Sequence, residues 1–189
     1  MIVYETVGAV NTDATLNLAL DTARDRGLDL VLASSTGETA KRLVALAQEK
    51  NFPNRLVVVR HVYGMEEPGV NDMPEETAQF LRDNGVTLVT AAHALSGAER
   101  GISKKFGGVS PVEIMAATLR MFGQGTKVCV EIAMMALDAG TIEYGKPVIA
   151  VGGSGRGADT VCRLTPEYTA DLMGTRIHEI LCKPSLEEA

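Results

Sequence analysis

The stretch LVLASSTGETAKRL, residues 30–43, joins an apolar run to an amphipathic helix and indicates how the whole chain folds. Residues 30–33 are continuously apolar, as in a strand of a parallel sheet that is covered on both faces. A polar turn follows, and from Ala40 onward the apolar residues recur at helical spacing. A buried strand that leads through a short turn into a helix is the repeating unit of an α/β fold.

The same alternation extends in both directions along the chain. A short strand at residues 2–4 precedes a helix that begins near Thr12 and ends at Gly27, a typical helix-terminating residue. Further strands are expected at residues 56–62, 87–92, 147–151, 160–164 and 176–182, and further helices at 74–84, 111–122, 127–139 and 166–173. Strands joined through helices need crossover connections, so the chain is expected to form one domain, residues 1–189, with a mostly parallel sheet in a three-layer α/β/α sandwich.

Several local signals refine this pattern. Ser110 and Glu113 have the spacing of a capping box with Pro111 between them, which predicts a helix start. Residues 127–140 contain strand-favouring valines, but their length and final glycine favour a buried helix. Gly123 and Gly125 are expected to separate this helix from the preceding one. In the helix that starts at Pro74, the side chains of Phe80 and Leu81 are expected to face inward.

Composition and charge exclude several classes of protein. Of the 189 residues, 46% are hydrophobic and 22% are charged, which is ordinary for a globular domain. The net charge of −6 argues against a general nucleic-acid or membrane-surface binder. No apolar run approaches the ~20 residues that a membrane-spanning helix needs, and the N-terminal residues do not resemble a signal peptide. Three cysteines without CxxC spacing are expected to be buried thiols, and a cytoplasmic location follows as an expectation.

The turn after residues 30–33 has the chemistry of a phosphate site. A helix N-terminus presents unpaired N–H groups and a partial positive charge, and small or hydroxyl-bearing residues let an anion approach them. The candidate phosphate-binding residues of this turn are Ser34, Ser35, Thr36, Gly37 and Thr39. The alternative is that a hydroxyl merely caps the helix. Glu38, in the first helical turn, would repel a bound anion.

A second candidate loop follows the strand expected at residues 147–151. Its residues match a GxGxxA dinucleotide-binding pattern, but a strand-like stretch stands where that pattern needs a long helix. A glycine-rich nest that holds a phosphate fits better, with a tight hairpin between two strands as the alternative. The candidate binding residues of this loop are Gly152, Gly153, Ser154, Gly155, Arg156 and Gly157.

A third candidate stretch, HALSGAERGISKK, begins at the end of the strand expected at residues 87–92 and is interpreted as a basic loop. His93, Ser96 and Arg100 are expected to line a ligand pocket on the same rim as the other two loops, because an arginine fork suits a phosphate. The alternative is a solvated loop. The histidines lack metal-binding spacing, so no metal site is expected. Glu131 is expected to pair with a lysine rather than to act as a base.

The sequence resembles two related groups of proteins. The segment from Ser34 to Ala40 is similar to the effector-binding turn in the C-terminal domain of pyruvate kinase, although Glu38 departs from that pattern and the catalytic barrel has no counterpart. The strings HALSGAERGISKKFGGVS, KVCVEIAMMALDAG and VGGSGRGADT resemble a family of stand-alone prokaryotic proteins described as pyruvate kinase C-terminal domain-like. This resemblance covers nearly the whole chain and implies a three-layer α/β fold, flavin mononucleotide (FMN) as the ligand, and phosphate contacts at residues 34–39 and 152–157.

The sequence therefore predicts a protein that binds a small phosphorylated molecule, with FMN favoured by the resemblance. Two other interpretations stay open: an enzyme that acts on a phosphorylated or flavin-linked substrate through His93, His61 or Cys129, and a regulatory module that binds an effector and a partner protein. The long polar loop from Tyr63 to Pro74 is expected to be a lid, an oligomer contact or a surface excursion. If this loop is an oligomer contact, the protein is expected to form a homo-oligomer.

Overall fold

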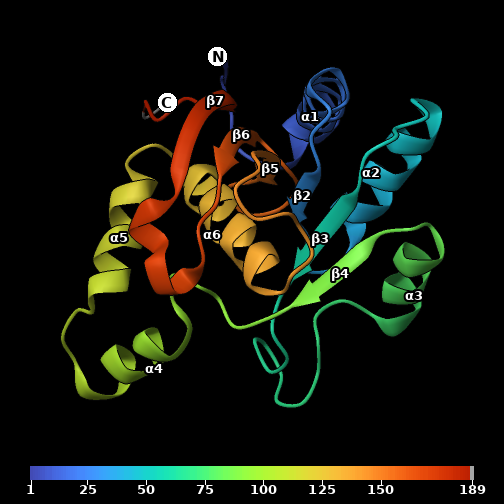
Figure 1. The fold of residues 1–189 in the computed structure, drawn as a ribbon. Coiled ribbons are helices and arrows are strands. Elements are labelled where there is room, and N and C mark those ends of the chain that lie inside the picture. The colour runs from blue at the N-terminus through green and yellow to red at the C-terminus, as the bar shows by residue number, and fades with distance from the viewer. Residues whose placement is uncertain (188–189) are drawn as a thin grey trace.

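The computed structural model describes residues 1–187, which form one seven-stranded sheet with helices on both faces (Figure 1). The strands are β1 (Ile2–Tyr4), β2 (Leu30–Ala33), β3 (Leu56–Arg60), β4 (Thr87–Thr90), β5 (Val148–Gly152), β6 (Thr160–Thr165) and β7 (Arg176–Pro184). The helices are α1 (Thr12–Arg26), α2 (Glu38–Glu49), α3 (Glu75–Asp83), α4 (Gly97–Phe106), α5 (Pro111–Arg120) and α6 (Gln124–Asp138), with two 3-10 segments, η1 (Ala9–Asn11) and η2 (Thr169–Gly174).

The strand order is β1-β7-β6-β5-β2-β3-β4, and only β6 runs against the others. β5 and β6 therefore form an antiparallel hairpin, whereas β5, β2, β3 and β4 are successive parallel neighbours. The predicted α/β class with a mostly parallel sheet is confirmed. The connections after β5, β2, β3 and β4 all begin at one edge of the sheet.

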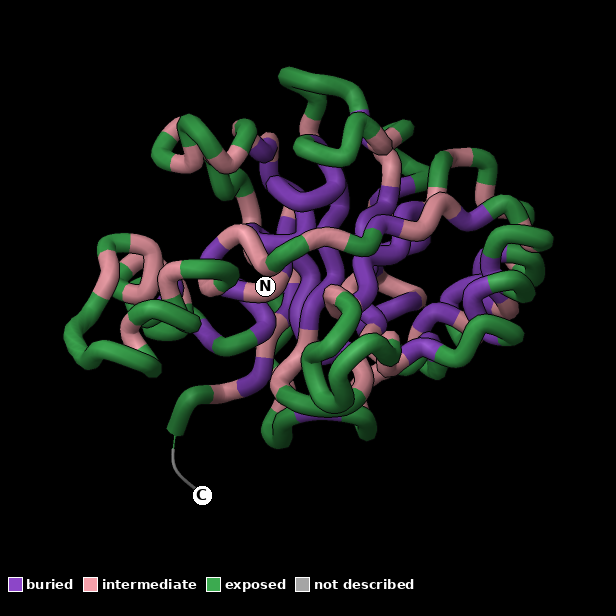
Figure 2. Tube along the Cα trace, turned by 90° about the horizontal axis from the view of Figure 1, so that it is seen from below, coloured by how far each residue is buried: buried purple, intermediate pink, exposed green. Residues whose placement is uncertain are grey.

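Two clusters of buried side chains lie on the two faces of the sheet. One joins α1, α2 and α3 to residues such as Leu32 and Ile149, and the other joins α5 and α6 to residues such as Val31 and Ala150. Alternate residues of one strand thus serve opposite faces, because side chains alternate along a strand. Figure 2 shows the buried strands at the centre and the exposed parts of the chain around them.

Several local predictions are confirmed. Gly27 ends α1 in the left-handed conformation at φ 63°. The Ser110 side chain accepts a hydrogen bond from the Glu113 backbone, and the Glu113 carboxylate accepts one from the Ser110 N–H, which completes the capping box. Residues 127–138 lie in a helix, α6, most of which is buried. The three cysteines are free and buried, and burial raises the pKa of the Cys129 thiol well above its usual range.

Other expectations were wrong. The side chain of Phe80 is 42% exposed, because α3 turns Thr77, Ala78 and Leu81 inward instead. Pro74 precedes α3 with an extended ψ of 143° rather than opening the helix. Residues 97–106 form a helix, α4, although they were interpreted as a loop. None of the residues of α4 is buried, and Gly97 and Gly101 lower the helix propensity of this stretch.

Gly125 does not break a helix but lies in the first turn of α6. A Cβ on this glycine would lie 2.1 Å from Thr160 Oγ1, and a Cβ on Gly152 would lie 2.6 Å from the Gly125 carbonyl oxygen. Neither position has room for a side chain, so glycine at both lets the start of α6 approach β5 and β6 closely. Gly123, which precedes α6 at φ 115°, makes the break between α5 and α6 alone.

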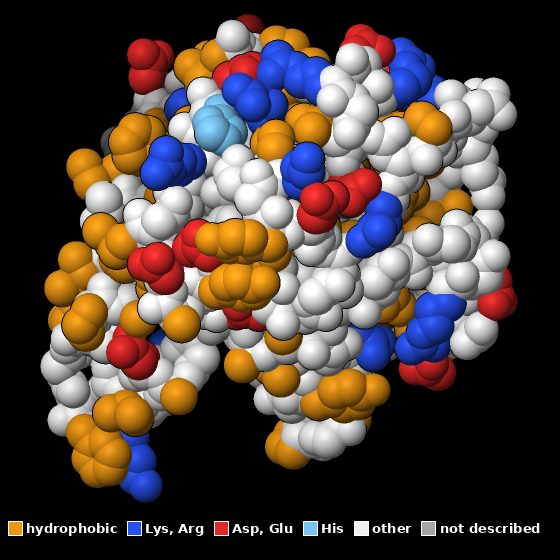
Figure 3. All heavy atoms as spheres, viewed as in Figure 1, with side chains coloured by type: hydrophobic (Ala, Val, Ile, Leu, Met, Phe, Trp, Pro, Cys, Tyr) orange, Lys and Arg blue, Asp and Glu red, His pale blue; other side chains and the backbone are white. Residues whose placement is uncertain are grey.

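Hydrophobic side chains gather over α4 and α5, toward the lower left of Figure 3. The exposed large hydrophobic residues of this region are Ile102, Phe106, Val109, Ile114, Met121 and Phe122. Within the described part of the chain, no helix has the length and apolar character needed to cross a membrane.

Stability is expected to fall in acid through Glu179. Its carboxylate lies 2.7 Å from Arg26 Nη1 and 2.8 Å from Arg163 Nε, and these partners lower the pKa of Glu179 from 4.5 to about 2. The folded state therefore binds fewer protons at this carboxyl than the unfolded state between those two values, so its contribution is present above pH 4.5 and is lost as the pH falls toward 2.

Urea unfolding of the protein and of a Glu179→Gln variant measures this effect. Between about pH 5 and about pH 2.5, the protein should lose more stability than the variant, because only the protein carries the titrating carboxyl. Equal losses in both proteins would show that the two arginines do not stabilise the ionised form of Glu179.

Candidate functional site

The connections after the four neighbouring strands β5, β2, β3 and β4 line one edge of the sheet. They are residues 153–159 after β5, 34–37 after β2, 61–74 after β3 and 91–96 after β4. Parallel strands lie ~4.8 Å apart, so consecutive connections begin at this spacing along the edge. Of the fourteen candidate site residues, all but Arg100 lie in or directly beside the connections after β5, β2 and β4, and Arg100 lies in the first turn of α4. The edge outside the carboxyl ends of parallel strands is also where α/β proteins generally bind ligands.

The hydroxyl-rich turn begins with Ser34, which is buried. Its Oγ accepts a hydrogen bond of 3.3 Å from the Ala40 N–H, so this side chain satisfies one donor of the first turn of α2. Gly37 occupies the N-cap position at φ 92° and offers no side-chain cap. A Cβ on Gly37 would lie 2.3 Å from the Thr77 Cγ2, so the turn packs tightly against α3. Capping therefore accounts for one hydroxyl of this turn.

The backbone donors of the turn are unoccupied. No N–H group from Ser35 to Thr39 donates a hydrogen bond to an acceptor within residues 1–187. Thr36 is exposed, and Ser35 and Thr39 are half-buried. The carboxylate of Glu38 lies 3.2 Å from Lys41 Nζ on the exposed side of α2. The first turn of α2 thus presents several free donors together with the positive end of the helix dipole.

The glycine-rich loop is the hairpin connection between β5 and β6, as the alternative interpretation held. Asp159 holds the loop in place, because its Oδ2 accepts hydrogen bonds from the N–H groups of Gly8 (2.8 Å) and Ser154 (3.0 Å). A Cβ on Gly157 would lie 2.4 Å from Thr12 Oγ1, so the loop contacts the segment before α1 closely. Forming the hairpin does not use all the backbone donors of the loop, because the N–H groups of residues 155–157 donate to no acceptor in the described chain.

The structure brings the hydroxyl-rich turn and the glycine-rich loop to neighbouring positions on one edge, because β2 and β5 pair directly. Both lie toward the face that carries α1, α2 and α3, as the contacts of Gly157 with Ala9 and of Gly37 with Met73 show. On that face, Gly37 packs against α3 and the segment before it, whereas Gly157 packs against the start of α1 and the segment before it. We call these two segments together the amide edge.

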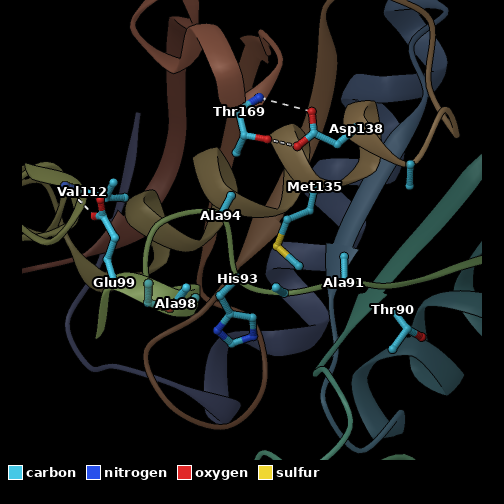
Figure 4. Close-up of a pocket in the computed structure, with 14 residues that line it drawn as sticks. Thr90, Ala91, His93, Ala94, Ala98, Glu99, Val112, Met135, Asp138 and Thr169 are labelled. Atoms are coloured by element: carbon cyan, nitrogen blue, oxygen red, sulfur yellow. Dashed lines mark hydrogen bonds between the residues drawn. The ribbon is translucent and has the colours of Figure 1, made fainter. Parts of the chain in front are cut away.

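Two cavities lie beside the connection after β4. They have volumes of about 580 Å³ and about 440 Å³ and share Ala92, His93, Ser96 and Gly97 as wall residues. Figure 4 shows the larger one, with the Met135 side chain extending from α6 toward His93. The structure therefore brings three of the candidate residues, His93, Ser96 and Arg100, together around these cavities. Residues of the amide edge line neither cavity.

The two cavities differ in their walls. The larger one lies against the C-terminal part of α6, where the Asp138 carboxylate accepts hydrogen bonds from the Thr169 N–H and hydroxyl (Figure 4). The smaller one combines apolar side chains, Val62 and Met65, with the cations Arg100 and Lys104. A pocket with an apolar floor and a cationic wall suits a ligand that has a flat ring and an anionic group.

His93 is held in a defined position between the cavities. Its ring centroid lies 5.3 Å from that of His61, whose Nδ1 is 2.5 Å from Asp72 Oδ2. Burial lowers the pKa of His93, and the charge of Glu131 opposes this shift. At neutral pH the His93 imidazole is therefore uncharged and has both a donor and an acceptor nitrogen.

A buried ion pair anchors the segment that carries His93. Glu131 accepts a hydrogen bond of 2.8 Å from the Leu95 N–H and also pairs with Lys127 one turn earlier in α6. The expected pairing of Glu131 with a lysine is thus confirmed, but the pair lies in the protein interior rather than on a helix surface. Burial lowers the pKa of Lys127, and the Glu131 charge opposes that effect.

The sequence interpretation missed Arg60, the last residue of β3. Its side chain is only 6% exposed, and its Nε donates a hydrogen bond of 2.7 Å to Thr90 Oγ1. The available signal was a single arginine at the end of the apolar run LVVVR, which an ordinary solvent-exposed strand end also carries. Within residues 1–187, no group of three or more His, Cys, Asp and Glu residues is arranged to hold a metal ion.

No known protein-family model matches the chain. A functional proposal therefore depends on the residues of the sheet edge and on the sequence resemblance described above.

Proposed function

We propose that the protein binds a phosphorylated small molecule at the carboxyl edge of its sheet, and that FMN is this molecule. The observation that carries the proposal is the direct parallel pairing of β2 with β5, which puts the free N–H groups of residues 35–39 beside the glycine-rich loop. Two sets of backbone donors that meet at one edge are the usual construction of a phosphate site.

The cavities beside His93 supply room for a ring. Volumes of about 440 Å³ and about 580 Å³ fall in the range of small-molecule pockets, roughly 300–1,000 Å³. β4 lies two strands from β2, so the connection that carries His93 begins ~10 Å from the hydroxyl-rich turn along the edge. We propose that the amide edge holds the phosphate and that the cavity walls, with Val62, Met65 and Ala92, contact the flavin ring.

The resemblance to pyruvate kinase C-terminal domain-like proteins supports the same ligand and a more specific fold. We propose that the sheet and its two helical layers are a version of that domain. The proposal concerns binding, and it assigns no reaction to the protein.

FMN is expected to bind with roughly micromolar affinity, and riboflavin at least about tenfold more weakly, since each hydrogen bond to a charged phosphate contributes ~1.5–3 kcal/mol. Calorimetric titration with both compounds measures this difference, and the visible spectrum of freshly purified protein reports any flavin that is already bound. Absence of measurable FMN binding would contradict the flavin proposal. Equal affinity for FMN and riboflavin would contradict the phosphate contacts.

An Arg156→Ala variant tests the glycine-rich loop. Its FMN affinity should fall by roughly 10- to 100-fold, while its riboflavin affinity should stay unchanged, because the exposed Arg156 side chain belongs to the loop that is proposed to hold the phosphate. Arg176→Ala is the matched control, since Arg176 is an exposed arginine of β7 and lies outside the amide edge and the cavity walls. Equal effects of the two substitutions would point to general charge attraction rather than to this loop.

A further inference from the structure

Arg60 is a buried cation without a counter-ion among the described residues. Its side chain is 94% buried, and its Nη1 has neither solvent contact nor a hydrogen-bond partner within residues 1–187. No carboxylate of the described chain lies within 4.0 Å of its guanidinium. Burying a charge without a partner is unfavourable, so such a side chain indicates that an anion occupies the site during function.

The surroundings of Arg60 fix the guanidinium in one position. Its Nε donates to Thr90 Oγ1, and its Cζ lies 5.7 Å from the centroid of the Tyr63 ring. Glu75, at the start of α3, is near enough for the Arg60 charge to contribute to lowering the pKa of its carboxyl. That carboxylate, however, is bound to Arg82 Nη1 at 2.7 Å on the exposed side of α3. This acid is therefore already paired with another cation.

Arg60 lies beside the start of the hydroxyl-rich turn. Ala33 of β2 pairs with Val59 of β3, and the Ser34 N–H donates to the Val59 carbonyl oxygen, so Ser34 and Arg60 occupy adjacent positions at the ends of neighbouring strands. Val58 packs with the cluster of α1, α2 and α3, and side chains alternate, so Arg60 projects to this same face. Gly37 packs against Met73 and Thr77, which closes the corner between α2 and α3 above β3.

We propose that Arg60 and the first turn of α2 form the two sides of one anion subsite, and that this subsite takes a phosphoryl group. The inference rests on the proposed function, because it assigns the subsite to the phosphate of the same ligand. In this proposal the Arg60 guanidinium supplies the charge and a planar fork of donors, and residues 35–39 supply backbone N–H groups that have no acceptor within residues 1–187. The Thr90 hydroxyl orients the fork by accepting from Nε.

Inorganic phosphate, titrated against the protein at constant ionic strength with chloride as the balancing anion, tests the subsite without a flavin. Phosphate is expected to raise the melting temperature, because a ligand that binds only the folded state stabilises it. In Arg60→Met, the dissociation constant for phosphate should rise by at least about tenfold. Arg176→Met is the matched control and should keep the phosphate response of the unchanged protein.

Two further measurements make the result specific. The melting temperature of Arg60→Met without phosphate should equal or exceed that of the unchanged protein, since an apolar side chain of similar length removes an unpaired buried charge. Arg60→Lys keeps the charge but loses the planar guanidinium and its Nε donor to Thr90. Its phosphate affinity should therefore lie between those of the unchanged protein and Arg60→Met. Circular dichroism verifies the fold of each variant.

The outcomes separate this inference from the proposed function. Phosphate dependence that persists in Arg60→Met would overturn the inference, as would a large fall in its melting temperature without phosphate, because that fall would reveal an internal partner. FMN binding that is unaffected by Arg60→Met would overturn the inference and leave the proposed function intact. A phosphate response that Arg60→Met abolishes, in a protein that does not bind FMN, would support the subsite and exclude the flavin.

Discussion

Replacing Asp159 with alanine is expected to lower the free energy of unfolding by about 3 kcal/mol, since a buried and a half-buried N–H group each lose an acceptor at a cost of ~1–3 kcal/mol. The Asp159 side chain is fully buried, and its carboxylate accepts from the N–H groups of Gly8 and Ser154 and from the Thr160 hydroxyl. It therefore fastens the glycine-rich loop to the segment before α1. Alanine leaves these donors without their protein partner.

Urea unfolding measures the change, with Ser154→Ala as the control. That substitution removes a half-buried hydroxyl but leaves the Ser154 N–H bonded to Asp159, so it should change the stability by less than about 0.5 kcal/mol. Asp159→Asn keeps one acceptor oxygen and should fall between the two. A loss below about 1 kcal/mol for Asp159→Ala would show that the loop does not depend on this carboxylate.

Replacing Glu131 with alanine is expected to cost about 3–5 kcal/mol, the range measured when one member of a buried ion pair is removed. Lys127 would then hold a buried charge without a partner, and the Leu95 N–H would lose its acceptor. The loss should also depend on pH. Burial already lowers the pKa of Lys127, and removal of Glu131 lowers it further, so the unfolded state binds more protons at this amine and the deficit should shrink as the pH rises from 7 toward 10.

A double variant, Lys127→Met with Glu131→Gln, separates the charge from the hydrogen bond. It removes both charges and keeps an acceptor for the Leu95 N–H, so its stability should return to within about 1 kcal/mol of the unchanged protein. Chemical unfolding at several pH values compares the three proteins. If the double variant is as unstable as Glu131→Ala, the ion pair itself stabilises the segment that carries His93, and the unpaired-charge explanation is wrong.

The sequence identified the candidate edge because its signals are local. The apolar runs at β2 and β5 and the small residues that follow each of them are contiguous in the chain, so their chemistry could be recognised without knowing the fold. That both turns begin at the same edge also followed, since the carboxyl ends of parallel strands share an edge. The binding of an anion there stays a prediction.

Most of the features that were missed depend on contacts between distant residues. Arg60 is buried and held in place because it donates a hydrogen bond to Thr90, thirty positions away in the chain, and because it projects to a covered face of the sheet. α4 was missed for a local reason, since Gly97 and Gly101 lower its helix propensity. Phe80 is exposed because α3 turns Thr77, Ala78 and Leu81 inward, with Thr77 packed against Gly37.

By itself the sequence determined the class of fold, the order of most helices and strands, and the loops that carry small, hydroxyl-bearing and basic residues. These properties follow from periodicity and from turn chemistry, which act over a few neighbouring residues. Only the tertiary structure decided that β6 runs antiparallel, that Asp159 ties the glycine-rich loop to Gly8, and that Arg60 is buried without a counter-ion. Burial and partnership are properties of residues that meet in space, and a linear pattern does not record which residues meet.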